Sequence, residues 1–253
     1  MNNITRFDTE NYEFNPNSKT GIYIIHGFTN TTYEVKKISQ YLSKKGHHVV
    51  AENLPGHGTH VEECNRVKYH DWISAVKEGV AKLSTTCDKI HIIGISMGGV
   101  LAMHISTLFP TASIIIVAPV LQFKNEFKVR VLVPLLNKLI PLTAKASQYD
   151  TPNTMKFYGY THYPNKALNE MRKLTNIVRK KLYNVTTPTL MIFSKSDKTC
   201  IMDNYDIIKN GLGSTVKESL ILNNLSHVML DDTNDLDEHK ILYTTINQFI
   251  NRF

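Results

Sequence analysis

Short apolar runs alternate along the chain with segments in which apolar residues recur at the period of a helix. The runs typical of buried strands are residues 21–25, 48–54, 89–94, 112–118, 188–193 and 218–222. Helix-period stripes lie between and after them, at residues 35–42, 72–83, 97–109 and 242–253. Strands that alternate with helices predict an α/β fold, in which a mostly parallel sheet is flanked by helices.

The alternation stops at Pro119. From there to Thr187 the pattern contains no convincing strand, and four prolines divide apolar, mainly helical pieces, one of them an amphipathic helix at residues 167–182. Segments of this length without a purpose are uncommon in compact domains. We therefore expect a core formed by residues 1–119 and 188–253, with a mainly helical cap inserted at residues 120–187.

The third strand runs directly into Gly94-Ile95-Ser96-Met97-Gly98, which opens the next helix. A Gly-x-Ser-x-Gly string also occurs by chance, but a strand before it and a helix after it predict a nucleophile elbow. In such a turn the serine oxygen is exposed, the helix N-terminus favours developing negative charge, and side chains at the two glycines would clash. We expect Ser96 to be a catalytic nucleophile; a glycine-rich connection without chemistry is the alternative.

A serine hydroxyl needs a base with a pKa near 7, which means a histidine. Of the eleven histidines, His227 follows the last strand and an asparagine-rich turn, whereas His239 falls in or beside the closing helix. In elbow hydrolases the order along the chain is serine, acid, histidine. We expect His227 to be the general base; an ordinary surface-turn histidine is the alternative.

The acid of such a triad orients the imidazole and stabilises its protonated form. Asp197 lies one short turn beyond the strand at residues 188–193 and is the expected acid. Asp203 and Asp206 fit N-capping of a helix, and the pair at 231–232 lies too close to the histidine along the chain.

A tetrahedral intermediate needs two N–H donors. The backbone N–H of Met97, directly after the nucleophile, is the expected first donor. The second should come from the loop after the first core strand, where Gly27 leaves room near the serine, and Phe28 N–H is the candidate. His26 is expected to brace this loop rather than act as a second base.

The composition is that of an ordinary globular protein, with 42% hydrophobic and 20% charged residues among 253, which excludes collagen-like and disordered classes. The longest apolar run, residues 112–121, is half the length of a membrane span. Three cysteines without a C-x-x-C pair indicate neither a disulfide framework nor a zinc site. No signal-peptide pattern is evident, so we expect a cytoplasmic protein that needs no metal or organic cofactor.

The net charge of +7 arises from 29 basic and 22 acidic residues. The basic residues are scattered, and the one tight run, at 179–181, falls in the amphipathic helix, where a solvated face is the simpler interpretation. Because no stripe of basic and aromatic residues is visible, we expect no nucleic-acid partner and at most peripheral contact with membranes. The oligomeric state is left open.

Several short motifs share their order with a known group of enzymes. They are His26-Gly-Phe-Thr29, Asn53-Leu-Pro-Gly-His-Gly58, Tyr69-His-Asp-Trp72, Gly94-Ile-Ser-Met-Gly-Gly99, an aspartate after a late strand, and Ser226-His-Val-Met-Leu-Asp231. Together they resemble the α/β-hydrolase superfamily, and within it small bacterial carboxylesterases and monoacylglycerol lipases, over almost the whole chain. The resemblance implies a serine ester hydrolase with a small helical cap over an acyl-binding pocket.

The resemblance places the triad on Ser96, Asp197 and His227 and the oxyanion donors on Phe28 and Met97, in agreement with the strand order. Two departures stand out. Asn30 occupies a position where the family usually has glycine, so the rim of the oxyanion hole is expected to be tighter or more polar. The segment 198–201 lacks the family's usual valine and proline, and the Gly56–Gly58 loop is interpreted as structural.

The cap contains an unusually apolar stretch at residues 129–142, broken by Pro134 and Pro141. This stripe is too wide for one solvent-facing helix, so it either packs wholly onto the core or lines a slot for an acyl chain. In the second case each buried methylene of substrate gains up to about 0.8 kcal/mol. The expected substrate contacts are Phe28, Asn30, Leu132, Leu136 and Val228.

The leading hypothesis is hydrolysis of short- to medium-chain carboxylic esters, with monoacylglycerols among the substrates, through an acyl-enzyme. The alternatives are a thioesterase or a carbon–carbon bond hydrolase of the same fold, and a hydrolase-fold protein that binds a small ligand with little turnover. Dehalogenases and epoxide hydrolases are disfavoured, because they have aspartate at the position of Ser96.

Overall fold

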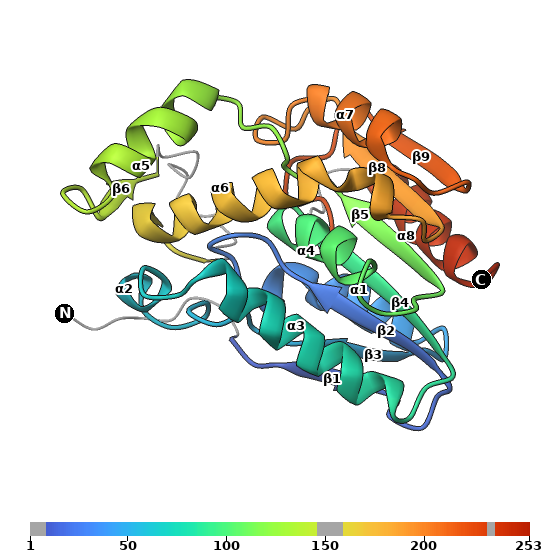
Figure 1. Cartoon of the computed structure of the whole chain (residues 1–253). Helices are drawn as coiled ribbons and strands as arrows, with labels where there is room; N and C mark the ends of the chain where they lie inside the picture. Colours follow the sequence, from blue (N-terminus) through green and yellow to red (C-terminus); the bar gives the residue numbers. More distant parts are fainter. Residues whose placement is uncertain (1–8, 146–158, 232–235) are drawn as a thin grey trace.

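Seven strands form one sheet in the order β1-β3-β2-β4-β5-β8-β9 (Figure 1). The computed structural model describes residues 9–145, 159–231 and 236–253. The strands are β1 (Tyr12–Phe14), β2 (Thr20–Ile25), β3 (His48–Ala51), β4 (Lys89–Ile95), β5 (Ser113–Val117), β8 (Thr189–Ser194) and β9 (Lys217–Leu222). All neighbours pair in parallel except β1, which is antiparallel to β3. The expected mostly parallel sheet is confirmed.

The edge strand β1 is absent from the sequence prediction. It has three residues, of which only Tyr12 is buried, so it shows neither the alternation nor the apolar run that marks a strand. The strands that were predicted also end close to the expected positions, although β3 stops at Ala51, before Pro55.

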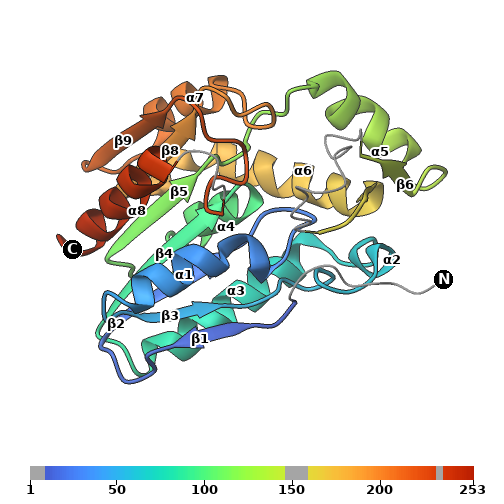
Figure 2. The same ribbon diagram turned by 180° about the vertical axis from the view of Figure 1, so that it is seen from behind.

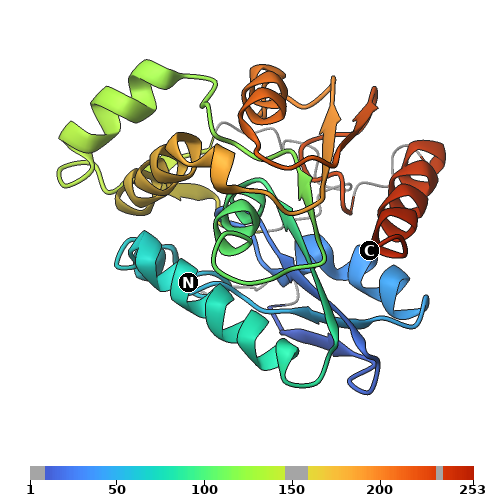
Figure 3. The ribbon, with the colours of Figure 1, turned by 45° about the vertical axis from the view of Figure 1, so that its right-hand side comes forward.

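Helices cover both faces of the sheet. They are α1 (Lys36–Ser43), α2 (Val61–Cys64), α3 (Tyr69–Ser84), α4 (Met97–Ile105), α5 (Val133–Leu136), α6 (Asn165–Lys180), α7 (Asp203–Gly211) and α8 (Leu236–Ile250), with short turns η1 (Thr32–Val35), η2 (Lys128–Leu132) and η3 (Leu182–Asn184). α1 and α8 lie together on one face (Figure 2), and α3, α4 and α6 lie on the other (Figure 3). Within the described ranges no helix combines the length and apolar character needed to cross a membrane.

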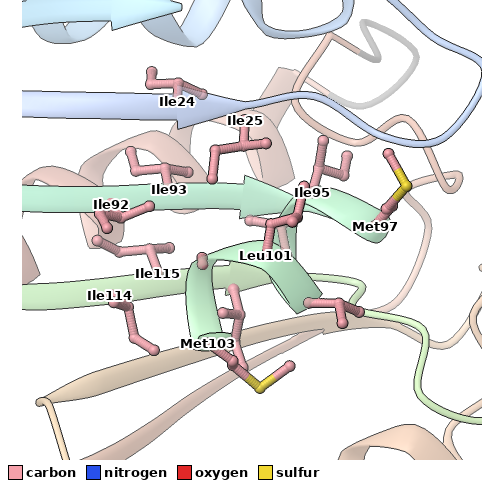
Figure 4. Close-up of a cluster of buried hydrophobic side chains, with 14 of the residues drawn as sticks. Ile24, Ile25, Ile92, Ile93, Ile95, Met97, Leu101, Met103, Ile114 and Ile115 are labelled. Carbon is pink, nitrogen blue, oxygen red and sulfur yellow. The ribbon is translucent and has the colours of Figure 1, made fainter. Parts of the chain in front are cut away.

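The core is built from β-branched side chains of the central strands and the apolar face of α4 (Figure 4). Ile92 and Ile93 of β4 and Ile114 and Ile115 of β5 have no exposed surface. Such residues suit strands that are covered on both faces. Met97 begins α4 inside this core, so the helix start is fixed against the carboxyl end of β4.

The segment inserted between β5 and β8 contains two short strands, although the sequence pattern predicted none. β6 (Leu142–Ala144) and β7 (His162–Pro164) pair antiparallel as a separate two-stranded sheet. Each has three residues, and Pro164 ends one of them, so neither leaves a pattern in the sequence. The prediction that this insertion lacks strands is therefore wrong, while its helices η2, α5 and α6 agree with a mainly helical cap.

The apolar stretch of the cap does not pack wholly onto the core. Val129 and Val133 are buried, but Leu135 is 69% exposed and Leu139 is 79% exposed. The backbone of η2 is a π-helix that leads into α5. Pro134 has no N–H to continue the ordinary ladder, which accounts for the wider turn before it.

Candidate active site

The four segments with candidate chemistry all follow carboxyl ends of parallel strands. His26 follows β2, Ser96 follows β4, Asp197 lies three residues beyond β8, and His227 lies five residues beyond β9. The carboxyl ends of parallel strands meet at one edge of the sheet, which is where ligands bind in open α/β sheets. The topology thus brings together residues up to two hundred positions apart.

Ser96 stands between β4 and α4 in a strained backbone conformation. Its φ is 55° and its ψ is −114°, a region that residues with side chains seldom occupy. A Cβ on Gly94 would lie 2.1 Å from the carbonyl oxygen of Gly98, and a Cβ on Gly98 would lie 2.2 Å from the carbonyl oxygen of Ile25. The clash expected at both glycines is confirmed, and the turn has the geometry of a nucleophile elbow.

Asp197 and His227 form a hydrogen-bonded pair. The His227 Nδ1 to Asp197 Oδ2 distance is 2.7 Å, and the Asp197 side chain is only 1% exposed. The other carboxylate oxygen accepts from the backbone N–H groups of Thr199 at 2.7 Å and Cys200 at 2.9 Å. Both oxygens are thus held by donors.

The pKa of His227 lies above its ordinary value. Burial lowers it, but the hydrogen bond to Asp197, the charge of Asp197 and the charge of Glu34 together outweigh burial. The imidazolium form is therefore stabilised relative to that of a free histidine, and it is the form that a general base adopts after it has taken a proton.

The competing aspartates and histidine are engaged elsewhere. Asp231 forms an ion pair with Lys37 at 2.9 Å, and His239 lies in α8, where Nε2 is 2.8 Å from the carbonyl oxygen of Met229. Asp203 and Asp206 lie in the first turn of α7, although the N-cap itself is Met202 rather than either of them. Asp232 lies outside the described residues.

The loop after β2 carries the second expected oxyanion donor. In the turns and loops that the structure describes, neither Phe28 N–H nor Met97 N–H donates to a backbone carbonyl. His26 is buried, and its Nε2 accepts from Leu54 N–H at 3.0 Å while Nδ1 lies 2.9 Å from the carbonyl oxygen of Gly27. Burial lowers the pKa of His26 to about 4, so it is neutral and braces the loop, as expected from the sequence.

Phe28 rests on two buried aromatic side chains. Its ring lies edge-on to those of His57 and Trp72, with centroids 6.1 Å away in each case. Trp72 Nε1 donates to the carbonyl oxygen of Pro55 at 3.1 Å. The Gly56–Gly58 loop thus packs against the loop that carries Phe28 (residues 26–30, called the oxyanion loop below for its expected role), which agrees with its structural interpretation.

Comparison with known proteins identifies the family. A family model described as "Serine aminopeptidase, S33" matches residues 16–234. The chain belongs to the S33 family. It is 29% identical to the thermostable monoacylglycerol lipase of Bacillus sp. (strain H-257) over 240 residues, covering 92% of this chain and 91% of that protein.

Two further similarities agree with this S33 assignment. A carboxylesterase of Bacillus subtilis (strain 168) is 25% identical over 217 residues, covering 85% of this chain and 87% of the relative. A chain from the work on LipS and LipT, two metagenome-derived lipolytic enzymes, superposes with a TM-score of 0.85 at 25% identity, covering 97% of this chain and 98% of the other. The fold is therefore that of α/β-hydrolase lipases and esterases.

Two charged residues of this S33 protein were missed by the sequence reasoning. Glu34, in η1, has no exposed surface, and its carboxylate accepts from Gly27 N–H at 2.7 Å. Lys145, which follows β6 in the cap, donates from Nζ to Thr29 Oγ1 at 2.6 Å. A glutamate at the start of a helix is commonplace, and nothing in the spacing distinguishes this one from a solvated side chain.

The cap and the oxyanion loop also touch through their backbones. Tyr160 N–H donates to the carbonyl oxygen of Thr29 at 2.9 Å, and Asn30 and Gly159 form an antiparallel bridge. Tyr160 Oη donates to the carbonyl oxygen of Gly56 at 2.6 Å. Residues on both sides of 146–158 thus bind to the same short loop.

The expected substrate contacts occupy different surroundings. Asn30 Nδ2 donates to Glu34 Oε1 at 2.5 Å, so this side chain is engaged within the loop. Leu132 and Leu136 are each 38% exposed on the cap, and they lie one helical turn apart. Val228 directly follows His227 and is half-buried. Their contact with substrate stays a prediction.

A separate hollow lies away from these groups. It has a volume of about 390 Å³ and is lined by residues of β1, β3 and α3, among them Glu13 and His48, and by Glu52 directly after β3. None of the triad candidates lines it, so it is not the site of the chemistry considered below.

Proposed function

We propose that this protein is a serine ester hydrolase that cleaves short- to medium-chain carboxylic esters, monoacylglycerols among them, through an acyl-enzyme. The observation that carries the proposal is the 2.7 Å hydrogen bond between His227 Nδ1 and Asp197 Oδ2. This bond leaves Nε2 as the basic nitrogen. The loops that carry Ser96 and His227 follow β4 and β9, whose carboxyl ends lie at the same edge of the sheet. Ser96, Asp197 and His227 then act as nucleophile, acid and general base.

In the first half of the reaction, His227 Nε2 takes the proton of Ser96 Oγ while that oxygen attacks the ester carbonyl carbon. The carbonyl oxygen becomes an oxyanion, which the N–H groups of Phe28 and Met97 and the N-terminus of α4 stabilise. The imidazolium, stabilised by Asp197, then donates its proton to the leaving alcohol as the carbon–oxygen bond breaks. The product of this half is an acyl group on Ser96.

In the second half, water replaces the alcohol. His227 takes a proton from water, the hydroxide attacks the acyl carbonyl, and the protonated histidine returns the proton to Ser96 Oγ as the acid leaves. The scheme uses only side chains, backbone N–H groups and water.

The named activities of the relatives support ester substrates, since they are a monoacylglycerol lipase and a carboxylesterase. The cap exposes apolar side chains, among them Leu132 and Leu136. This apolar surface supports a substrate with an acyl chain rather than one with a polar chain. The strongly exposed Leu135 and Leu139 further support peripheral contact with a lipid surface.

The test is hydrolysis of p-nitrophenyl esters with acyl chains from two to sixteen carbons, together with monoacylglycerols. Ser96→Ala is the decisive variant, and Ser39→Ala is the matched control, because Ser39 is a buried serine of α1 that donates to the carbonyl oxygen of Val35 at 2.7 Å. We expect turnover to fall by orders of magnitude in Ser96→Ala and to persist in Ser39→Ala. If the acyl chain enters an apolar slot, kcat/KM should rise about fourfold per methylene until the slot ends.

The same assay separates the alternatives. Because the family is described as serine aminopeptidases, aminoacyl p-nitroanilides and acyl thioesters are included as further substrates. Turnover of only the anilides or only the thioesters would mean that the triad cleaves an amide or a thioester bond rather than an ester. If the protein binds these compounds saturably without turning them over, and Ser96→Ala binds them equally well, the protein is a ligand-binding protein and not an enzyme.

A further inference from the structure

Glu34 is a carboxylate without exposed surface beside the site, and the reaction scheme above does not use it. A fully buried carboxylate is costly unless donors satisfy both of its oxygens. In Glu34 both oxygens are used: Oε2 accepts from Gly27 N–H at 2.7 Å, and Oε1 accepts from Asn30 Nδ2 at 2.5 Å. Both partners belong to the oxyanion loop.

These two bonds bracket the expected oxyanion donor. Gly27 and Asn30 lie on either side of Phe28, and Asn30 N–H also donates to the carbonyl oxygen of Gly27 at 3.2 Å. Thr29, between them, has a φ of 66°, so the loop is a tight turn held in a conformation that side chains disfavour. A carboxylate bound to both ends of this turn fixes the direction of Phe28 N–H.

Glu34 also lies close to the reacting groups. A Cβ placed on Gly27 would be 3.2 Å from Glu34 Oε2 and 3.3 Å from the Cβ of Ser96. The carboxylate and the nucleophile therefore flank the same glycine. The charge of Glu34 raises the pKa of His227, in the same direction as Asp197.

We propose that Glu34 is a positioning residue of the hydrolase, which fixes the oxyanion loop and supplies a second negative charge to His227. The inference rests on the proposed function. Asp197 approaches the imidazole through Nδ1, whereas Glu34 is bonded to the loop after β2. Two carboxylates near one imidazole stabilise it most when it holds the extra proton, which is the state formed as Ser96 attacks.

The charge balance of Glu34 is set by its neighbours. Burial keeps the pKa of Glu34 above its ordinary value, although the Gly27 N–H, the charge of His227, the Asn30 amide and the charge of Lys145 each lower it. Lys145 comes from the cap and His227 from the loop after β9, so the positive charges face Glu34 from two different elements. Both hydrogen-bond partners are donors, and donors match the ionised form.

The decisive variant is Glu34→Gln, which keeps the shape and removes the charge. Its amide nitrogen cannot accept from Asn30 or Gly27, so one bond on the loop is lost as well. Asn30→Ala separates the two effects, because it removes one bond and keeps the charge. The matched control is Glu170→Gln, a 4% exposed carboxylate of α6 that accepts from Lys173 Nζ at 2.7 Å.

Two measurements are made. The first is an NMR titration of the His227 ring in the Ser96→Ala background, which needs no turnover. The second is the pH profile of kcat and KM for the best p-nitrophenyl ester of the wild type. For Glu34→Gln we expect the His227 pKa to fall by about one unit, the acid limb of kcat/KM to move to lower pH, and kcat to fall about tenfold with KM little changed.

For Asn30→Ala we expect a lower kcat with no movement of the His227 titration, and for Glu170→Gln no change in either. An unchanged His227 pKa in folded Glu34→Gln would overturn the proposal that the charge of Glu34 acts on His227. An unchanged kcat in Asn30→Ala would overturn the proposal that Glu34 fixes the oxyanion loop. If Glu34→Gln does not fold, Asn30→Ala still decides the second point. Failure of the wild type to cleave esters would remove the proposed function, while the NMR result would still show whether Glu34 acts on His227.

Discussion

The hydrogen bonds of Asp197 allow a specific prediction for Asp197→Asn. One carboxylate oxygen accepts from the backbone N–H groups of Thr199 and Cys200, at 2.7 and 2.9 Å, and the other from His227 Nδ1 at 2.7 Å. An asparagine has only one oxygen. Two backbone donors will hold that oxygen, so the NH2 group must face His227.

The consequence is a change of tautomer. An NH2 group donates to Nδ1, which forces the imidazole proton onto Nε2, the nitrogen that must accept the proton of Ser96. A triad with the wrong tautomer loses about 10⁴-fold in kcat, which corresponds to roughly 5 kcal/mol of transition-state stabilisation. The fold should change little, because the side chain keeps its size and most of its hydrogen bonds.

The assay is the kcat of Asp197→Asn on the best ester of the wild type, with thermal unfolding to confirm the fold and Ser96→Ala as the baseline. Asp197→Ala is the informative comparison, because it leaves the histidine free to place its proton on Nδ1, and we expect it to retain more activity than Asp197→Asn. A well-folded Asp197→Asn within tenfold of the wild type would refute the assignment of the acid. Greater activity in Asp197→Asn than in Asp197→Ala would refute the tautomer argument.

Two further predictions concern stability. Gly98→Ala places a Cβ 2.2 Å from the carbonyl oxygen of Ile25, so chemical denaturation should show that the free energy of unfolding falls by at least about 3 kcal/mol. Gly46→Ala, at a φ of 93° with no atom within 4 Å of the added carbon, should lower it by only about 1 kcal/mol. Equal losses in the two variants would contradict the argument from close approach. The pKa values of His26, His57 and His91 are lowered by burial to about 4, 3 and 4 from 6.5. At these three sites the unfolded chain therefore binds more protons than the folded chain below about pH 6.5. Their contribution to the free energy of unfolding should fall as the pH drops from about 6.5 towards 4, by up to about 1.4 kcal/mol per pH unit for each histidine. Denaturation at a series of pH values in wild type and in His91→Leu checks this, and an unchanged slope in the variant would contradict it.

The sequence predicts the central sheet well, because its strands are runs of isoleucine and valine between helix-period stripes. The run from Ile90 to Ile95 can hardly form anything but a buried strand, and Gly94 and Gly98 restrict the turn after it. Asp197 and His227 could be selected by their position after late strands. The hydrogen bond between them agrees with that selection.

The missed features lack such patterns. β6 and β7 have three residues each, and their pairing depends on contacts across the cap rather than on local propensity. Glu34 carries no signal, because its burial arises only when η1 packs against the oxyanion loop. The exposure of Leu135 and Leu139 could not be predicted either, since an apolar stripe is equally compatible with a buried or a solvent-facing cap.

The attachment of the cap to Thr29 limits how this enzyme can be altered. Lys145 and Tyr160 both bind to that residue, one through its hydroxyl and the other through its carbonyl. A chimaera that exchanges residues 120–187 with those of a relative therefore also exchanges two supports of the oxyanion loop. Under the proposed function, substrate range and catalytic rate are thus coupled, and a successful transplant of the cap would need matching changes at residues 27–34.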